Sequence, residues 1–334
     1  METYASLRER ISSRRRTWLV TGAAGFIGSH LVEHLLALGQ NVIGLDNFAT
    51  GRRDNVAHLD FNLIEGDIRN LDTCREACRS VELVLHEAAL GSVPRSIERP
   101  MPTHESNVNG FLNMLIAARD AGVSRLVYAS SSAVYGDDDT MPKVEERTGR
   151  PMSPYGLSKQ VNEQYASVFA TCYGFESVGL RYFNVFGPRQ DPDHPYASVI
   201  PAWLGALLRN QPAYINGDGT ISRDFCHVDN VVQANLLAAM TESPAALNQA
   251  YNVAHGEQIT LSELFELMRM LMAPRLPHMR TVRPVHRAPR RGDLPRSLAS
   301  IDKAARLLGY RPSHNLRSGL QQTIDWYAEN LAHA

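Results

Sequence analysis

The stretch Trp18-Leu-Val-Thr-Gly-Ala-Ala-Gly-Phe-Ile-Gly28 carries the strongest structural signal in the chain. Its first four residues are typical of a short buried strand, and leucines at helical spacing follow it as far as Gly39. Glycines at such a strand-to-helix turn let backbone N–H groups approach a pyrophosphate, and the helix dipole favours its negative charge. The stretch therefore predicts a dinucleotide site on a parallel sheet.

Asp46 closes the next expected strand, residues 41–45. A carboxylate at this place accepts hydrogen bonds from both ribose hydroxyls and repels a 2′-phosphate, which predicts NAD rather than NADP. A tight turn with Asp46 as a simple cap is the alternative. The glycine pattern, its strand-to-helix context and the acidic residue agree on the cofactor site.

Two further strand ends carry residues that suit a bound cofactor. Asp67 and Ile68 follow one short strand, and Ala88-Ala89 follow another. In an open parallel sheet, ligands bind beyond the carboxyl ends of the strands. We expect Asp67 to reach the adenine and the alanines to let the backbone approach the cofactor, although capping or packing would also explain these residues.

Short apolar runs alternate with helical patterns through the first half of the chain. The expected strands are 18–21, 41–45, 63–64, 81–85, 126–129 and 177–181. The expected helices are 28–39, 72–79, 107–121 and 158–173. Continuous apolar strands between helices are typical of a parallel sheet that is covered on both faces. The fold class is therefore α/β, a Rossmann-type doubly wound parallel sheet.

Residues 186–334 lack this regular alternation of strands and helices, because prolines and glycines become frequent. We expect them to form a smaller, mixed α/β substrate-binding domain after a Rossmann domain at 17–185. Helices at 228–240 and 261–271 flank a strand at 250–253, so segments near 222–255 return to the first domain. The arginine-rich stretch 274–296 is expected to be a loop.

Residues 1–16 form an N-terminal arm with several arginines and no apolar run behind them, so the start of the chain does not resemble a signal peptide. Leu7 and Ile11 could share one face of a short surface helix. A frayed arm is the other interpretation.

Tyr155 and Lys159 are four residues apart, a spacing that puts both side chains on one helix face. An ammonium group favours the phenolate, so we expect Lys159 to lower the pKa of Tyr155 and to suit it for proton transfer near neutral pH. The run Ser130-Ser131-Ser132 ends the preceding strand. A hydroxyl there is placed to bond the substrate oxygen that exchanges its proton with Tyr155.

The composition excludes several classes of function. The net charge is −1, from 34 basic and 35 acidic residues, which argues against a nucleic-acid protein. No apolar stretch is long enough to span a membrane. The four cysteines show no metal-ligand spacing, so we expect no metal site and a reducing, cytoplasmic location.

These motifs resemble those of the extended short-chain dehydrogenase/reductase superfamily, and within it the UDP-hexose 4-epimerases. The resemblance covers nearly the whole chain. The matching segments are Thr21–Gly28, Asp46-Asn47, Asn107–Gly110, Ser130–Ser132, Tyr155 with Lys159, Leu180–Val185, Gly217–Gly219, Arg223–Phe225 and Arg290–Asp293.

The resemblance implies a role for each matching residue. Ser131 corresponds to the catalytic hydroxyl, with Ser132 as the neighbouring candidate. Tyr155 corresponds to the general base, and Lys159 binds the nicotinamide ribose. The implied NAD contacts are Gly22, Ala24, Gly25, Phe26, Ile27, Gly28, Asp46, Asn47, Phe48, Thr50, Gly51, Asp67, Ile68, Ala88, Ala89, Asn107, Ser130, Tyr155, Lys159 and Tyr182.

A UDP-sugar is the implied substrate. Asn184 would face its phosphates, Arg223 and Arg290 would clamp the diphosphate, and Asp293 would reach the uridine ribose. The complete set of implied substrate contacts is Ser92, Arg95, Ser131, Tyr155, Asn184, Val199, Tyr214, Asn216, Arg223, Arg290, Asp293 and Ser297.

The segment Ala89-Leu-Gly-Ser-Val-Pro-Arg-Ser-Ile97 resembles the epimerases that act on N-acetylated UDP-hexoses or their uronates. The resemblance places Ser297 at a position where epimerases limited to UDP-glucose and UDP-galactose have a bulky tyrosine in the hexose pocket. The smaller serine is expected to leave room for an acetamido group. We therefore expect 4-epimerisation of UDP-GlcNAc and UDP-GalNAc. The alternatives are a UDP-GlcNAc uronate or UDP-glucuronate 4-epimerase, then a UDP-glucose 4-epimerase or a non-catalytic nucleotide-binding regulator.

Two related reactions are disfavoured by Ser132-Ala133. The related 4,6-dehydratases have an Asp-Glu pair at these two positions. The UDP-glucuronate decarboxylases usually have a glutamate at the second position. The resemblance also implies a homodimer, in which helices near 103–121 and 154–173 pack against their symmetry mates.

Overall fold

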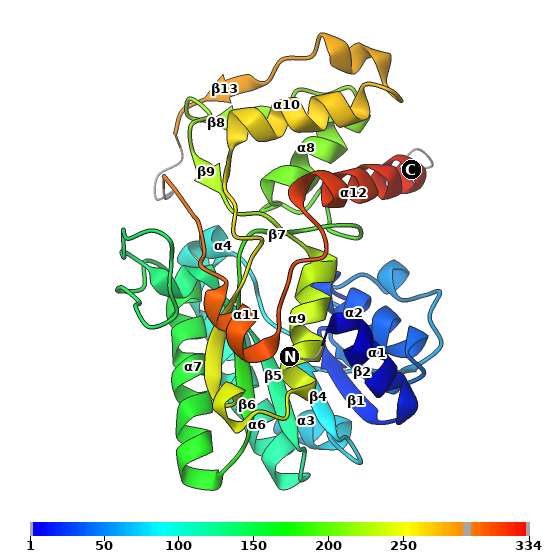
Figure 1. Cartoon of the computed structure of the whole chain (residues 1–334), viewed down its shortest axis with the longest axis vertical. Helices are drawn as coiled ribbons and strands as arrows, with labels where there is room; N and C mark the ends of the chain where they lie inside the picture. The colour runs from blue at the N-terminus through cyan, green and yellow to red at the C-terminus, as the bar shows by residue number, and fades with distance from the viewer. Residues whose placement is uncertain (1–2, 290–294, 332–334) are drawn as a thin grey trace.

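A seven-stranded parallel sheet forms the centre of the molecule (Figure 1). The computed structural model describes residues 3–289 and 295–331. The strands are β1 (Thr17–Thr21), β2 (Asn41–Asp46), β3 (Asn62–Glu65), β4 (Leu83–His86), β5 (Arg125–Ser131), β6 (Ser177–Tyr182) and β11 (Gln249–Val253). Their order across the sheet is β11-β6-β5-β4-β1-β2-β3. The predicted doubly wound α/β fold is confirmed.

The two halves of the sheet wind outward in opposite directions from β1 and β4. These two strands are direct neighbours, with Val20 opposite Leu85. Open α/β sheets bind ligands at this switch point, beyond the carboxyl ends of the strands. The glycine turn after β1 and the alanines after β4 both lie at this edge.

Helices cover both faces of the sheet. The first face carries α1 (Tyr4–Ser13), α2 (Phe26–Ala37), α9 (Val228–Met240) and α11 (Asp302–Leu308). The second face carries α3 (Leu71–Ala77), α6 (Gly110–Asp120) and α7 (Pro154–Tyr173). Successive strand residues alternate between the two cores, as Val20 and Leu19 do.

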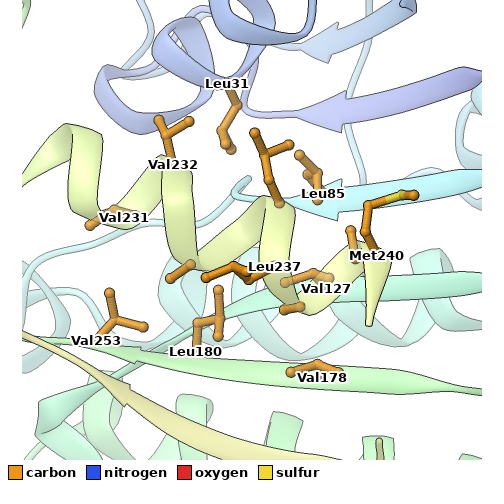
Figure 2. Packing of buried hydrophobic residues seen from close by; sticks show 14 of the residues in the cluster. Leu31, Leu85, Val127, Val178, Leu180, Val231, Val232, Leu237, Met240 and Val253 are labelled. Atoms are coloured by element: carbon orange, nitrogen blue, oxygen red, sulfur yellow. The ribbon is translucent and has the colours of Figure 1, made fainter. Parts of the chain in front are cut away.

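Helix α9 lies across the first face of the sheet (Figure 2). Leu237 packs above Leu180 and Val127 of the sheet, and Val232 lies beside Leu31 of α2. Nearly every residue of α9 is buried, because the helix is covered by the sheet below and by α1, α2 and α11 around it. Helix α9 and β11, which lie within residues 222–255, therefore share the core of the first face.

The connection from β4 to α6 begins with a loop, residues 87–92, and is mostly helical after it. The helical part consists of α4 (Val93–Glu98), α5 (Pro100–His104) and a π-helical turn, η2 (Glu105–Asn109). Single π turns within helices are frequent at functional sites. This one places Asn107 beside the loop that follows β4. Short 3₁₀ turns complete the first domain: η1 (Arg53–Asn55), η3 (Ser132–Tyr135) and η4 (Pro244–Ala246).

A second, smaller core lies beyond the carboxyl edge of the sheet, at the top of Figure 1. Its helical elements are α8 (Val199–Leu208), α10 (Leu261–Met272), η5 (Pro277–Arg280) and α12 (Leu316–Leu331). Its strands form three short pairs: β7 (Val185–Phe186) with β10 (Cys226–His227), β8 (Tyr214–Asn216) with β13 (Val285–Arg287), and β9 (Ser222–Arg223) with β12 (Ile259–Thr260).

Three expectations need correction. Residues 274–296 are not simply a loop, because η5 and β13 lie within them. Helix α11 packs on the sheet, so the chain after residue 186 returns to the first domain a second time. The N-terminal arm forms a helix, α1, which was one of its two expected forms, but it is not a surface helix, because Leu7 and Ile11 are buried in the core of the first face.

Among residues 3–289 and 295–331, no helix combines the length and the apolar character that crossing a bilayer requires.

Candidate functional site

A cavity of about 580 Å³ opens at the switch point between β1 and β4. It brings together most of the residues that were predicted to bind NAD and the sugar. The predicted residues in its lining are Gly22, Gly25, Phe26, Ile27, Gly28, Asp46, Asn47, Thr50, Gly51, Ile68, Ala88, Ala89, Ser92, Arg95, Ser130, Ser131, Ser132, Tyr155, Lys159, Tyr182 and Asn184.

The glycine turn is shaped for close approach. Gly22 has φ of +67°, and a Cβ atom there would lie 2.9 Å from the backbone nitrogen of Ala88. A Cβ atom on Gly28 would lie 2.0 Å from the carbonyl oxygen of Gly22. Gly25 is the N-cap residue of α2 and lines the cavity. Side chains at Gly22 or Gly28 would collide with neighbouring backbone, so these glycines allow a tight turn, and the start of α2 at the cavity wall fits a dinucleotide pyrophosphate.

Asp46 is fixed at the cavity wall by backbone donors. Its carboxylate accepts hydrogen bonds from the N–H groups of Ala24 (2.9 Å) and Phe48 (2.7 Å). Burial raises the pKa of Asp46, and these backbone hydrogen bonds work against that rise. Ala24 and Phe48 therefore orient Asp46 and do not themselves line the cavity.

The side chain of Asp67 does not reach the cavity. It accepts hydrogen bonds from Asn47 Nδ2 (2.8 Å) and from Arg69 Nη2 (2.8 Å). The hydrogen bonds from Arg69 lower the pKa of Asp67 to about 2. Asp67 lines a separate shallow hollow, and its contact with the adenine stays a prediction.

Asn107 also lies outside the cavity lining, although it supports the wall. Its amide pairs with both backbone groups of Leu90, accepting from the N–H at 2.8 Å and donating to the carbonyl at 3.2 Å. It also donates to Ser158 Oγ of α7 at 3.1 Å. Asn107 therefore ties the loop after β4 to the helix that carries Tyr155.

Tyr155 and Lys159 meet at the sheet edge, as their spacing predicts. Lys159 Nζ donates to the carbonyl oxygen of Ala129 at 2.8 Å and lies 6.0 Å from the centre of the Tyr155 ring. Helix α7 is capped by Ser153, and the Tyr155 N–H donates to Ser96 Oγ at 3.1 Å. The helix start and α4 thus hold Tyr155 in place.

The charges at this place differ from the sequence-based expectation. Burial raises the pKa of Tyr155, a hydrogen bond with the Ser131 hydroxyl lowers it, and the charge of Glu87 raises it again. Burial lowers the pKa of Lys159 to about 8, and the charge of Glu87 works in the opposite direction. Burial is the largest influence on both groups, so the pKa of Tyr155 lies above its ordinary value, and the expected effect of Lys159 on it stays a prediction.

The three serines have different surroundings. Ser130 Oγ donates to Glu163 Oε1 at 2.6 Å, so its hydroxyl is engaged away from the cavity. Ser131 Oγ accepts from the Ala133 N–H at 3.1 Å and also bonds Tyr155. Ser132 begins η3 and lines the cavity. Ser131 is thus the hydroxyl that lies with Tyr155.

Sequence reasoning missed Glu87. It follows β4 directly, lines the cavity and accepts a hydrogen bond from the Tyr182 hydroxyl at 2.7 Å. An acidic residue directly after an apolar strand was the available signal. Also missed were Arg52, Asn55, Arg189, Gln190, Asp191, His194 and Ser198 of the cavity lining.

Arg95 and Asn184, two residues predicted to contact the substrate, line the cavity. Arg95 Nη2 lies 3.4 Å from His194 Nε2. Ser92 caps α4 by accepting from the Arg95 N–H at 3.2 Å. Asn184 Nδ2 donates to the carbonyl oxygen of Asp224 at 2.8 Å, which fixes its side chain at the wall.

The remaining predicted substrate residues are not in the described lining. The Arg287 guanidinium lies 3.2 Å from the centre of the Tyr214 ring, and the Ser297 N–H donates to the Ser222 carbonyl at 3.1 Å. The predicted substrate residues outside the lining are Val199, Tyr214, Asn216, Arg223 and Ser297. All five belong to the second region or its flanks, and their contacts with substrate stay predictions. Arg290 and Asp293 lie outside the described residues.

One group of potential metal ligands occurs among the described residues, at the start of α9. The ligand atoms of His227, Asp229 and His314 lie within 4.8 Å of one another. Helix capping accounts for this arrangement, because His227 Nδ1 accepts a hydrogen bond from the Asp229 N–H at 3.3 Å. The group is separate from the cavity.

Known proteins resemble this chain over most of its length. Residues 18–254 match the NAD dependent epimerase/dehydratase family. A UDP-glucose 4-epimerase of Mycolicibacterium smegmatis is 36% identical, with 92% of this chain and 97% of the relative covered. A UDP-N-acetylglucosamine 4-epimerase of Methanobrevibacter ruminantium, solved with UDP-N-acetylmuramic acid, is 34% identical with a TM-score of 0.88 over 95% of this chain and 99% of that chain.

A third relative carries both kinds of ligand. The UDP-glucuronic acid 4-epimerase of Bacillus cereus, solved with UDP-glucuronic acid and NAD, is 29% identical with a TM-score of 0.85. The alignment covers 94% of this chain and 99% of that chain.

Proposed function

The chain belongs to the NAD-dependent epimerase/dehydratase family, and we propose that it interconverts UDP-GlcNAc and UDP-GalNAc by epimerisation at C4. Its reaction class is UDP-sugar 4-epimerisation, an isomerase reaction, and its cofactor is NAD. The choice of an N-acetylated substrate and the residue roles below are the proposal.

The glycine turn, the start of α2 and Asp46 would hold the dinucleotide. NAD, when bound, accepts hydride from C4 of the sugar and later returns it to the opposite face. The protein must therefore keep the flat 4-keto sugar in the cavity while the sugar rotates to present its other face.

Tyr155 and Ser131 would manage the proton of the sugar O4. As the C4–H bond breaks, the O4 proton passes to Tyr155 and C4 becomes a ketone. The reverse transfer restores the hydroxyl. Ser131 lies within hydrogen-bonding reach of Tyr155 and would orient O4 between the two groups. Lys159, held by the Ala129 carbonyl, would favour the deprotonated phenol during the transfer.

The observation that supports an N-acetylated substrate is the position of the segment 89–97. Residues 89–93 and Arg95 line the cavity. Ser96, in the same segment, accepts the hydrogen bond from the Tyr155 N–H. The part of the sequence that resembles the N-acetyl subgroup therefore lies beside the proposed base, where the sugar must sit.

The proposal is tested by incubating the purified protein with UDP-GlcNAc, UDP-GalNAc, UDP-Glc, UDP-GlcA and UDP-GlcNAc uronate in separate reactions, with products assigned by NMR. We expect kcat/KM to be highest for the N-acetylhexosamine pair. Tyr155→Phe is the control: it should lose about 10²- to 10⁴-fold in kcat while retaining NAD, because general acid–base groups contribute about that much. Faster turnover of UDP-Glc than of UDP-GlcNAc would reject the proposal.

A uronate substrate is the second candidate. Arg95 and His194 place two basic side chains together in the cavity wall. A guanidinium group is well suited to bind a carboxylate. If a uronate is the best substrate in the same assay, Arg95→Gln should lower kcat/KM for the uronate more than for the neutral sugar.

We also propose a homodimer and a cytoplasmic location. Helices α5 and α7 expose Met101, Leu157, Val168 and Tyr173, which are between 51% and 64% exposed. Leu157, Val168 and Tyr173 lie on α7, one of the two helices that the resemblance implies for dimerisation, and Met101 lies just before the other segment, 103–121. The free thiols of all four cysteines support a reducing compartment.

A further inference from the structure

We infer that Glu87 is an electrostatic positioning residue that favours the oxidised form of the bound nicotinamide. Glu87 lies at the carboxyl end of β4, next to Ala88-Ala89, and its side chain is accessible only in part, in the wall of the cavity. This inference rests on the proposed function only in requiring NAD in that cavity.

A chain of hydrogen bonds fixes the Glu87 carboxyl group. The Tyr182 hydroxyl donates to Glu87 Oε1 at 2.7 Å, and Asn235 Nδ2 donates to the same hydroxyl at 2.9 Å. Tyr182 ends β6 and Asn235 belongs to α9, so two elements hold the group in place. Burying a carboxyl group is costly, and a site that retains one with dedicated donors suggests use of its charge.

Glu87 interacts with both groups of the proposed catalytic pair. Its charge raises the pKa of Tyr155 and that of Lys159. Burial raises the pKa of Glu87 itself to about 7, while the Tyr182 hydrogen bond and the charge of Lys159 lower it. Glu87 is therefore ionised at pH 8 and largely protonated at pH 6.

The consequence for the cofactor follows from charge. An oxidised nicotinamide ring is positively charged and a reduced ring is neutral. A nearby anion therefore stabilises the oxidised form, and a nearby cation destabilises it. The cationic Lys159 destabilises the oxidised ring, and the ionised Glu87 offsets this effect. An epimerase needs this balance, because it must return every hydride and finish each turnover with the oxidised cofactor.

The experiment measures the oxidised-to-reduced ratio of bound NAD in the purified holoenzyme, at equilibrium with a dye couple of known potential and without sugar nucleotide. At pH 8, Glu87→Gln should lower the ratio about tenfold relative to wild type, which is about 30 mV for a two-electron couple. At pH 6 the two proteins should agree within about twofold, since Glu87 is then largely protonated and carries little charge in the wild type.

Other groups near Glu87 affect this contrast to different extents. The charge of Glu87 raises the pKa of Lys159, so Lys159 is less protonated in Glu87→Gln and offsets part of the change at pH 8. Burial lowers the pKa of the neighbouring His86 to about 3, so His86 stays neutral. Burial raises the pKa of Tyr182 well above its ordinary value, which keeps this phenol uncharged. Glutamine preserves the shape of the side chain and still accepts a hydrogen bond from Tyr182.

Glu145→Gln is the matched control. Glu145 is buried and accepts a hydrogen bond from the Asn252 N–H at 2.8 Å, but it is not in the cavity lining. Its substitution should leave the ratio unchanged at both pH values. A ratio for Glu87→Gln that equals the wild type at pH 8, or that differs equally at pH 6 and pH 8, overturns the inference.

If Glu87→Gln releases its NAD, the inference is tested with Glu87→Asp instead, because aspartate keeps the negative charge. Retention of NAD with a wild-type ratio in Glu87→Asp supports the inference, and loss of either overturns it. Because no sugar nucleotide is present, this result is independent of whether UDP-GlcNAc is the substrate.

Discussion

Asp46 and Asp67 follow neighbouring strands of the sheet, yet their carboxylates have different partners. Asp46 accepts only backbone N–H groups and faces the cavity. Asp67 is bound by Arg69 and Asn47 in a separate hollow. A carboxylate without a cationic partner keeps more of its acceptor sites for ribose hydroxyls than one that already accepts a forked arginine.

Substitution of Asp46 should therefore weaken NAD binding, and substitution of Asp67 should not. A hydrogen bond to a charged group contributes about 1.5–3 kcal/mol, so Asp46→Ala should bind NAD roughly 10- to 150-fold more weakly. Asp67→Ala should stay within about threefold of wild type. Isothermal titration of NAD into cofactor-free protein measures both. Equal effects of the two substitutions would show that Asp46 does not hold the ribose.

Local spacing predicted the residues that meet at the sheet edge. The glycine turn, Asp46, Ser131, Tyr155 and Lys159 all line one cavity, because strand ends in a parallel sheet converge at one edge. Their protonation could not be predicted, because it depends on burial and on Glu87, which lies on a different strand.

Helices and strands with a clear apolar pattern were predicted within a few residues. Helix α9 has the expected bounds of 228–240, and β11 occupies 249–253 where 250–253 was expected. Helices α8, α11 and α12 were not predicted. Helix α8 follows a proline-rich stretch, and α11 is only about two turns long, so local pattern gave a weak signal for both.

Helix α1 was expected at the surface, but it is bound to the core. Leu7 and Ile11 are at most 1% exposed, and Gln40 Nε2 donates to the carbonyl oxygen of Ile11 at 2.9 Å. Arg10 Nη2 donates to the carbonyl of Met240 at 3.0 Å, which ties α1 to the end of α9. Amphipathic spacing was visible in the sequence, but the partner surface on α9 was not.

Leu7→Ala should therefore lower the free energy of unfolding by about 2–5 kcal/mol, the usual cost of truncating a buried leucine. Arg8→Ala, on the exposed side of the same helix, should change it by no more than about 0.5 kcal/mol. Urea denaturation followed by circular dichroism measures the difference. Equal stability of the two variants would mean that α1 is not part of the core in solution.

The assembled molecule presents an apolar surface on α5 and α7. Leu157→Arg should convert the proposed dimer to a monomer, because burying an unpaired charge in an interface is strongly unfavourable. Met270→Arg is the matched control, since Met270 is 53% exposed on α10, away from these helices. Light scattering after gel filtration at micromolar concentration gives the mass. A wild-type monomer, or a dimer that persists in Leu157→Arg, would contradict the proposal.

The pairing of β11 with β6 has a consequence for synthesis of the protein. Strand β6 ends at Tyr182, while its partner β11 ends at Val253, so the sheet edge stays open while the intervening residues are translated. At about 5–20 residues per second, this delay is on the order of 4–14 s. Helix α9 arrives within the same interval and covers the exposed apolar face. The nascent chain therefore presents an unpaired strand and a bare core surface outside the ribosome, which makes this interval the natural time for a chaperone to bind.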